Sequence, residues 1–193
     1  MEAIKTFKKD NMVLEIYTDD ELASNPREWD NLGHMICFHN GYDLGDKHDL
    51  KQTDFNNWEE LKKYIEKEFK PVAMLPLYLY EHSGITMNTT GFSCPWDSGQ
   101  VGFIYCTEKD LEYMGSPRDK AEEILKAEVE IYNQYITDDV YSFCLTELKT
   151  CEHCDHTSKE VIDSCGGYFG SDFKENNLFE DAGIKDINEW KEC

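Results

Sequence analysis

Two groups of cysteine and histidine residues have spacings that would allow chemistry. The first group lies at two turn signals inside an aromatic stretch and contains Cys94, His82 and Asp97. If both turns close at one end of a sheet, Asp97 would orient the His82 imidazole, and His82 would activate the Cys94 thiol. That is the arrangement of a cysteine-dependent hydrolase. The alternative is that Cys94 is a small packed side chain and that Asp97 serves the turn.

The second group is a C-x-x-C motif formed by Cys151 and Cys154, with His153 and His156 in the same segment. This spacing lets two thiolates hold one zinc ion from a tight turn, and an imidazole would add a third ligand. We therefore expect a zinc site at Cys151, Cys154 and His156. Two alternatives stay open, a polar loop with reduced thiols and a redox pair, because no second pair of ligands follows the motif.

An acidic loop follows the first histidines of the chain and contains Asp43, Asp46, His48 and Asp49. Oxygen-rich loops of this kind can hold a hard cation, but the spacing does not match an EF-hand. The sequence therefore favours a solvated acidic loop at this place.

The chain is strongly acidic, with 40 Asp and Glu residues against 19 Lys and Arg and a formal net charge of -21 in 193 residues. Such a protein repels nucleic acids and membranes and attracts basic surfaces, although a dispersed negative charge also serves solubility. We expect a basic, nucleic-acid-binding protein as the partner, and no direct contact with nucleic acid. The expected contact acids are Glu122, Glu123, Glu130, Asp138 and Asp139.

The hydrophobic pattern predicts an α+β fold, an antiparallel sheet with two main amphipathic helices packed on one face. The expected helices are Trp58–Phe69 and a longer one that starts at Ser116-Pro117 and ends near Ile136. The expected strands are 12–18, 34–39, 72–80, 85–89 and 101–106, and a hairpin of 140–148 with 159–165.

The same reading assigns residues 1–170 to a single domain, with residues 149–158 as its elaborated hairpin tip. Residues 171–193 are expected to form an acidic tail that docks on this domain through Leu178, Phe179, Ile184, Ile187 and Trp190. The pair Gly166-Gly167 is expected to end the second hairpin strand. No apolar run suits a signal peptide or a membrane span, which predicts a cytoplasmic protein.

Three strings give the chain a resemblance. They are WDNLG at 29–33, LPLYLYEHSG at 75–84 and CPWDSGQVGFIY at 94–105, and the segment DSCGGYFG at 163–170 accompanies them. With these strings the chain resembles a family of uncharacterised small proteins carried by bacteriophages and mobile elements. The family has no established activity. Small acidic proteins of phages and mobile elements are often inhibitors of host defence, so the implied origin suggests an inhibitor of a restriction or CRISPR-type enzyme that mimics nucleic acid. The resemblance transfers no catalytic residue.

Three functions therefore remain open. The first is the acidic inhibitor, the second is a hydrolase that uses Cys94 and His82, and the third is a protein-binding module stapled by zinc.

Overall fold

The computed structural model describes the chain except for residues 1, 20–22, 152 and 155. The contacts divide it into two compact units, one formed by Met1–Ser24 with Asp138–Cys193 and the other by Asn25–Thr137. The α+β class is confirmed, but where the sequence predicts one domain over residues 1–170 the structure has two units. The reason is that the second unit is inserted between two strands that pair with each other in the first, and each unit has its own buried core.

The first unit is built on a five-stranded antiparallel sheet with the order β8-β7-β2-β1-β9. The alternating pattern of its strands places apolar side chains on one face, where they pack together. The expected hairpin is present and is formed by β7 and β8. The strands are β1 (Lys5–Lys9), β2 (Met12–Thr18), β7 (Val140–Thr150), β8 (Thr157–Phe169) and β9 (Lys191–Glu192).

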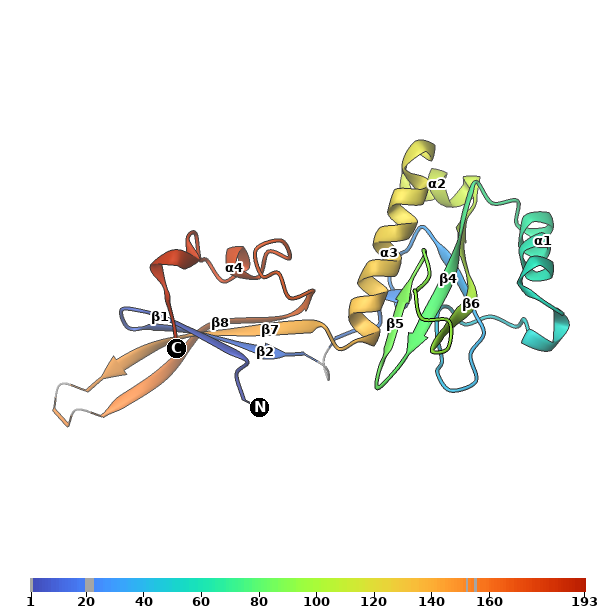
Figure 1. Ribbon diagram of the computed structural model, residues 1–193. Helices are drawn as coiled ribbons and strands as arrows, with labels where there is room; N and C mark the ends of the chain where they lie inside the picture. The colour runs from blue at the N-terminus through green and yellow to red at the C-terminus, as the bar shows by residue number, and fades with distance from the viewer. Residues whose placement is uncertain (1, 20–22, 152, 155) are drawn as a thin grey trace. The chain divides into compact units, whose positions relative to one another are not determined.

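The C-terminal segment covers the apolar face of this sheet. Leu178, in the short helix α4 (Leu178–Asp181), is fully buried, and Ile184 is also buried. Both pack with Leu14 and Ile16 of β2, together with the expected Phe179, Ile187 and Trp190. Figure 1 shows this red segment along one side of strands β1, β2 and β7.

The prediction that Gly166-Gly167 ends the second hairpin strand is wrong. Strand β8 continues to Phe169, because the two glycines form a β-bulge opposite Ser142. Gly167 has a φ of 82°, and its N–H donates to the carboxylate of the buried Asp19 at 2.7 Å. A Cβ on Gly166 would lie 2.3 Å from the same carboxylate, so this position requires glycine.

The second unit has a four-stranded antiparallel sheet with the order β3-β6-β4-β5. It contains β3 (His34–Cys37), β4 (Ala73–Glu81), β5 (Ile85–Asn88) and β6 (Ser98–Cys106), and the helices α1 (Trp58–Glu68), α2 (Glu108–Met114) and α3 (Ala121–Ile136). Asn57 caps α1 as its residue type predicts, since its side chain accepts the N–H of Glu60 at 3.0 Å. Helix α3 begins later than expected, because residues 118–120 form a 3-10 turn after Pro117.

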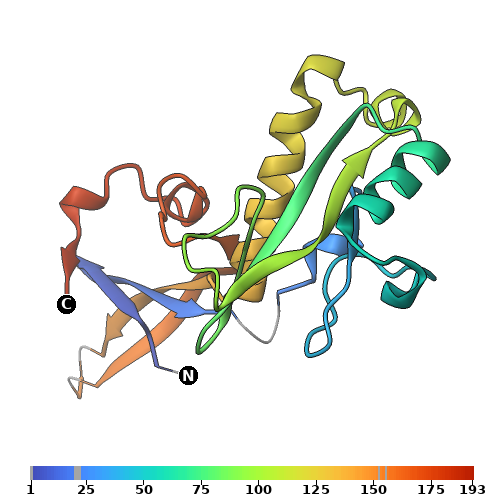
Figure 2. The same ribbon diagram turned by 45° about the vertical axis from the view of Figure 1, so that its right-hand side comes forward.

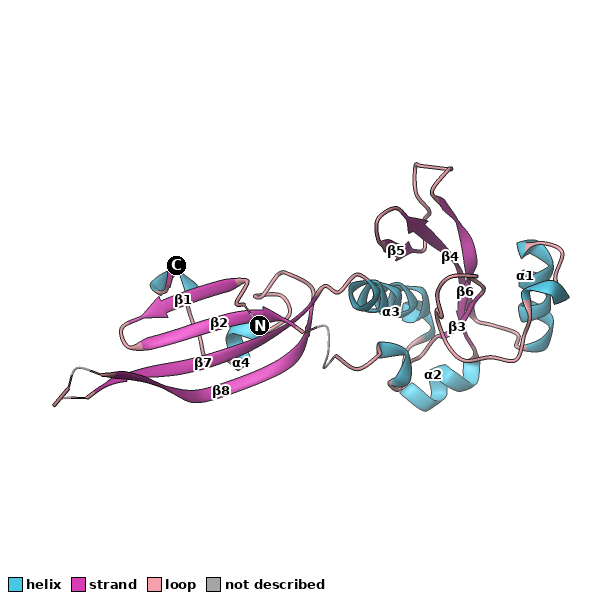
Figure 3. Cartoon of the chain, turned by 90° about the horizontal axis from the view of Figure 1, so that it is seen from below, coloured by secondary structure: helices cyan, strands magenta, loops and turns pink. Residues whose placement is uncertain are grey.

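The two main helices lie on opposite faces of this sheet, which corrects the prediction that both pack on one face. Ile104 packs with Leu125 of α3, whereas its neighbours Phe103 and Tyr105 pack with Leu61 of α1. Figures 2 and 3 show α1 and α3 on either side of β4 and β6. Alternate residues of one strand face opposite sides, so a strand that is apolar throughout has to be covered twice.

A buried ionic network fixes the loop that follows β3. The Arg27 side chain, only 3% exposed, binds Asp46 through two nitrogens at 2.7 and 3.1 Å and lies 3.3 Å from Glu128 of α3. Asp46 in turn accepts the N–H of Met35 at 2.7 Å, and Glu128 accepts the N–H of Leu32 at 2.7 Å. Asp46 therefore stabilises the fold through its ion pair with Arg27 and its hydrogen bond from Met35. The expected acidic loop is thus only partly solvated at Asp46.

No helix in the described part of the chain is long and apolar enough to cross a membrane.

Candidate functional site

A groove of about 420 Å³ opens in the second unit where β4 ends and β6 begins. We call it the acidic groove and define it by the lining residues that carry charge or aromatic rings. Two smaller hollows of about 350 and 150 Å³ adjoin it and share Phe38 and Gln52 with it. The defining residues are Phe38, His39, Trp58, Glu81, Trp96 and Asp97.

The pairing of β4 with β6 places two carboxylates side by side at this groove. Tyr80 pairs with Ser98, and one step further the N–H of Glu81 donates to the carbonyl of Asp97 at 2.8 Å. A tight turn follows Glu81, with Ser83 at a φ of 55°. The strings at 75–84 and 94–105 thus run into the groove from neighbouring strands.

The expected hydrolase residues meet at the same end of the sheet, but in a different order. Asp97 lies in the middle, because its carboxylate accepts the Cys94 thiol at 3.4 Å and lies 3.6 Å from Nδ1 of His82. Within the described part of the chain no hydrogen bond joins Cys94 to His82. The acid and not the imidazole contacts the thiol, so this order does not provide the histidine base that would activate Cys94 as a nucleophile.

A second histidine–carboxylate pair lies at the groove and was not expected. Nδ1 of His39 accepts the N–H groups of Gly41 and Tyr42 at 3.1 and 3.2 Å. In the neutral ring the proton is therefore on Nε2, which lies 3.5 Å from the carboxylate of Glu81. The loop after β3 thus orients the imidazole so that it faces Glu81.

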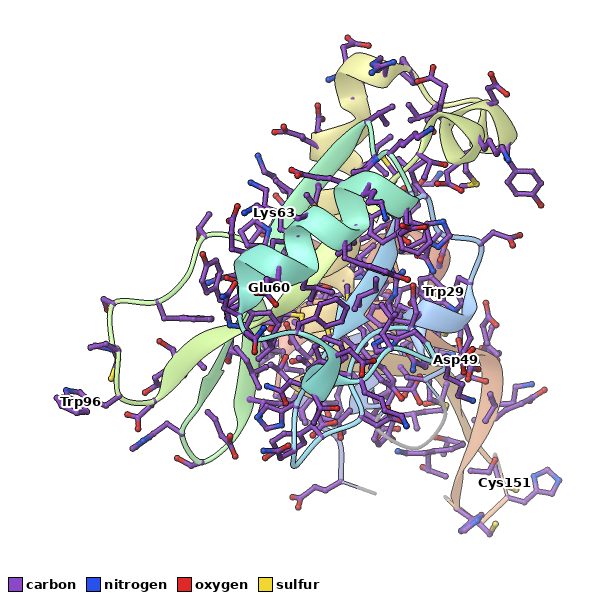
Figure 4. The ribbon with its side chains drawn as sticks, turned by 90° about the vertical axis from the view of Figure 1, so that its right-hand side faces the viewer. Trp29, Asp49, Glu60, Lys63, Trp96 and Cys151 are labelled. Carbon is purple, nitrogen blue, oxygen red and sulfur yellow. The ribbon has the colours of Figure 1, made fainter. Side chains whose placement is uncertain are left out.

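Aromatic side chains complete the lining. Phe38 and Trp58 have their ring centroids 6.4 Å apart in a stacked arrangement. Trp96 is 92% exposed, and Figure 4 shows it extending from the tip of its loop. An indole that is left in water contributes nothing to the core, so the fold does not require Trp96.

The expected zinc ligands lie at the tip of the β7–β8 hairpin in the first unit, where Figure 4 labels Cys151. The N–H of Cys151 donates to the carbonyl of His156 at 2.8 Å. The pKa of the Cys151 thiol is lowered because the backbone of His153, and then the thiol and backbone of Cys154, hydrogen-bond to its sulfur. No cluster of three or more potential metal ligands occurs among the described residues, which exclude positions 152 and 155 at this tip.

The expected partner-binding acids belong to different units. Glu122, Glu123 and Glu130 are exposed on α3 of the second unit, and Glu123 pairs with Lys120. Asp138 and Asp139 belong to the first unit, where Asp139 accepts the hydroxyl of Tyr141 at 2.8 Å.

None of the known protein families, characterised proteins and solved structures with which the chain was compared matches it.

Proposed function

We propose that the protein is an acidic inhibitor that binds the basic nucleic-acid-binding surface of another protein. In line with the resemblance, the expected target is a host defence enzyme of restriction or CRISPR type. The observation that carries the proposal is the net charge of -21, to which both folded units contribute an excess of carboxylates. Negative charge on a folded surface attracts cationic surfaces over a distance of about 8–10 Å at physiological salt.

The contacts of the reactive residues support binding rather than hydrolysis. Cys94 donates to a carboxylate instead of an imidazole, and His82 and His39 each face a carboxylate instead of a thiol. Each imidazole is therefore placed to hold an acid in position. We accordingly rank the cysteine-dependent hydrolase, with Cys94, His82 and Asp97, behind the inhibitor.

The test is capture of a partner from a bacterial lysate on the immobilised full chain, with free duplex DNA added as a competitor. We expect a basic nucleic-acid-binding protein that is retained at low salt, released at high salt and displaced by duplex DNA. Binding that is insensitive to both salt and duplex DNA would contradict mimicry of nucleic acid.

A pair of matched variants tests whether the acids of α3 make the contact. Glu122→Gln with Glu130→Gln removes two exposed charges from α3, and Glu59→Gln with Glu68→Gln removes two from α1. We expect the α3 variant to lower the affinity for the captured partner several-fold more than the α1 variant. Equal losses in the two variants would show that only the total charge matters and that α3 is not the contact surface.

A further inference from the structure

We propose that the acidic groove binds an arginine side chain of the partner protein. This inference rests on the proposed function and deepens it, because it names the chemical group that anchors the partner. Its three supports are the charge of the lining, the aromatic rings and the orientation of the histidines.

The lining has two acidic side chains, Glu81 and Asp97, that pair with no lysine or arginine in the described part of the chain. Glu81 and Asp97 keep 53% and 39% of their side chains exposed, so both carboxylates are accessible to a ligand. No lysine or arginine is found among the described residues that line the groove. A cation that enters therefore meets two fixed acceptors whose positions the β4–β6 pairing sets.

The aromatic rings favour a planar cation. Trp58 and Trp96 both line the groove, and the exposed indole of Trp96 is free of packing against the core. A guanidinium stacks on an aromatic face and also forms two parallel hydrogen bonds to a carboxylate, whereas an ammonium is a compact, strongly hydrated point charge. A groove with carboxylates and indoles together thus fits arginine better than lysine.

The histidines leave part of each carboxylate open to a ligand. His39 accepts two backbone N–H groups at Nδ1, so the nitrogen that it presents to Glu81 is Nε2, at 3.5 Å. His82 lies against Asp97 through Nδ1. In each pair one carboxylate oxygen contacts the ring, and the carboxylate keeps lone pairs for a guanidinium.

The experiment uses the full-length chain labelled with ¹⁵N and two blocked tripeptides, Gly-Arg-Gly and its neutral analogue with citrulline, which has the same shape as arginine. The chain contains four tryptophans, whose indole N–H signals report separately. We expect the arginine peptide to shift the signals of Trp58 and Trp96 but not those of Trp29 and Trp190. The citrulline peptide is expected to leave all four unchanged. Equal shifts with both peptides would overturn the inference, because the groove would then not recognise charge.

Variants test the carboxylate and the indole separately. We expect Asp97→Asn, which keeps the acceptor for Cys94, and Trp96→Ala each to weaken arginine-peptide binding about tenfold. Trp96→Phe should retain part of the affinity, because it keeps an aromatic face. The control is Glu112→Gln, an exposed acid on α2, which should bind as the unaltered protein does. Equal losses for Asp97→Asn and Glu112→Gln would contradict the groove.

The same variants distinguish the groove from the proposed function. If partner capture depends on salt and duplex DNA but is unchanged in Trp96→Ala and Asp97→Asn, the groove inference fails and the inhibitor proposal stands. If the arginine peptide binds as expected but the captured partner is indifferent to salt and duplex DNA, the inhibitor proposal fails and the groove stands.

Discussion

Replacement of Arg27 is the most decisive test of how the acidic groove is supported. The guanidinium holds Asp46 with two hydrogen bonds, lies 3.3 Å from Glu128, and donates to the carbonyl of Gly33 at 2.6 Å. Asp46 belongs to the loop that also carries His39, so Arg27 ties this loop to α3, beside the hydrogen bond from the N–H of Gly45 to the hydroxyl of Tyr132 at 2.9 Å. In Arg27→Ala, two carboxylates that are 28% and 12% exposed would lose their cation.

The expected cost follows from the burial of the partners. Removal of one member of a buried ion pair destabilises a protein by about 3–5 kcal/mol, because the remaining charge is desolvated without compensation. Water can reach Asp46, which is partly exposed, so we expect a loss of about 3 kcal/mol. With a urea dependence of about 2 kcal/mol per molar, the midpoint would fall by about 1.5 M. Arg27→Lys keeps the charge but not the planar fork, and should cost about 1–2 kcal/mol.

The assay is urea unfolding followed by tryptophan fluorescence in a Trp190→Phe background, where the three remaining tryptophans all belong to the second unit. A double-mutant cycle of Arg27→Ala with Glu128→Gln then gives the coupling between the two side chains. A loss below about 1 kcal/mol in Arg27→Ala, or no coupling to Glu128, would refute the reasoning, since exposed ion pairs contribute no more than that.

Three further predictions concern the first unit and the thiols. Gly166→Ala should lower the free energy of unfolding by about 1–3 kcal/mol, because the added Cβ would lie 2.3 Å from a carboxylate oxygen of the buried Asp19. The control is Gly84→Ala, where nothing lies within 4 Å of the added Cβ, and it should cost much less in thermal unfolding. Equal effects of the two variants would contradict the close packing at the β-bulge. In protein treated with EDTA, iodoacetamide should modify Cys151 before Cys37 at pH 7–8, because a lowered pKa gives more thiolate, while burial raises the pKa of Cys37 to about 12. Mass spectrometry reads the order, and faster labelling of Cys37 would contradict the prediction. The zinc-stapled module, the third function left open by the sequence, predicts about one zinc ion per chain in elemental analysis, lost in Cys151→Ser with Cys154→Ser. Metal-free protein from zinc-replete cells would rule this module out.

The elements were predictable from sequence where the deciding interactions are local. Asn57 is the N-cap of α1, and its side chain accepts a hydrogen bond from the N–H of Glu60, three residues later. The spacing of the apolar residues Leu61 and Ile65 identifies the buried side of that helix. The hairpin of β7 and β8 likewise joins neighbouring segments. Such contacts leave a signal in a short window of sequence.

The arrangement of the units was not predictable in the same way. Strand β2 pairs with β7, so Leu14 lies opposite Leu145, with the whole second unit between them in the sequence. No local pattern encodes a pairing at that separation. The placement of the helices did have a signal, because Val101–Cys106 is buried at every position, as in a strand that is covered on both faces.

In the acidic groove, too, one residue pair was predictable from the sequence and another was not. The two turn signals around His82 and Asp97 correctly suggested that these residues approach one another. His39 and Glu81 were missed as a pair, because their approach depends on the path of the chain after β3, where the N–H of Phe38 bonds the carbonyl of Val101. That carbonyl belongs to a bulge in β6, and a one-residue irregularity of this kind is not visible in the hydrophobic pattern.

The resulting geometry is the reason why we propose binding and not catalysis for the reactive residue types at this site. A hydrolase needs its histidine between the nucleophile and the acid, so that the ring can take a proton from the nucleophile. Here the acid Asp97 stands between Cys94 and His82, and His39 is fixed toward Glu81. Both imidazoles thus lie against carboxylates of residues that line the groove. The same residues place two carboxyl groups in one groove with two indoles, and this combination is the basis of the arginine site that we propose.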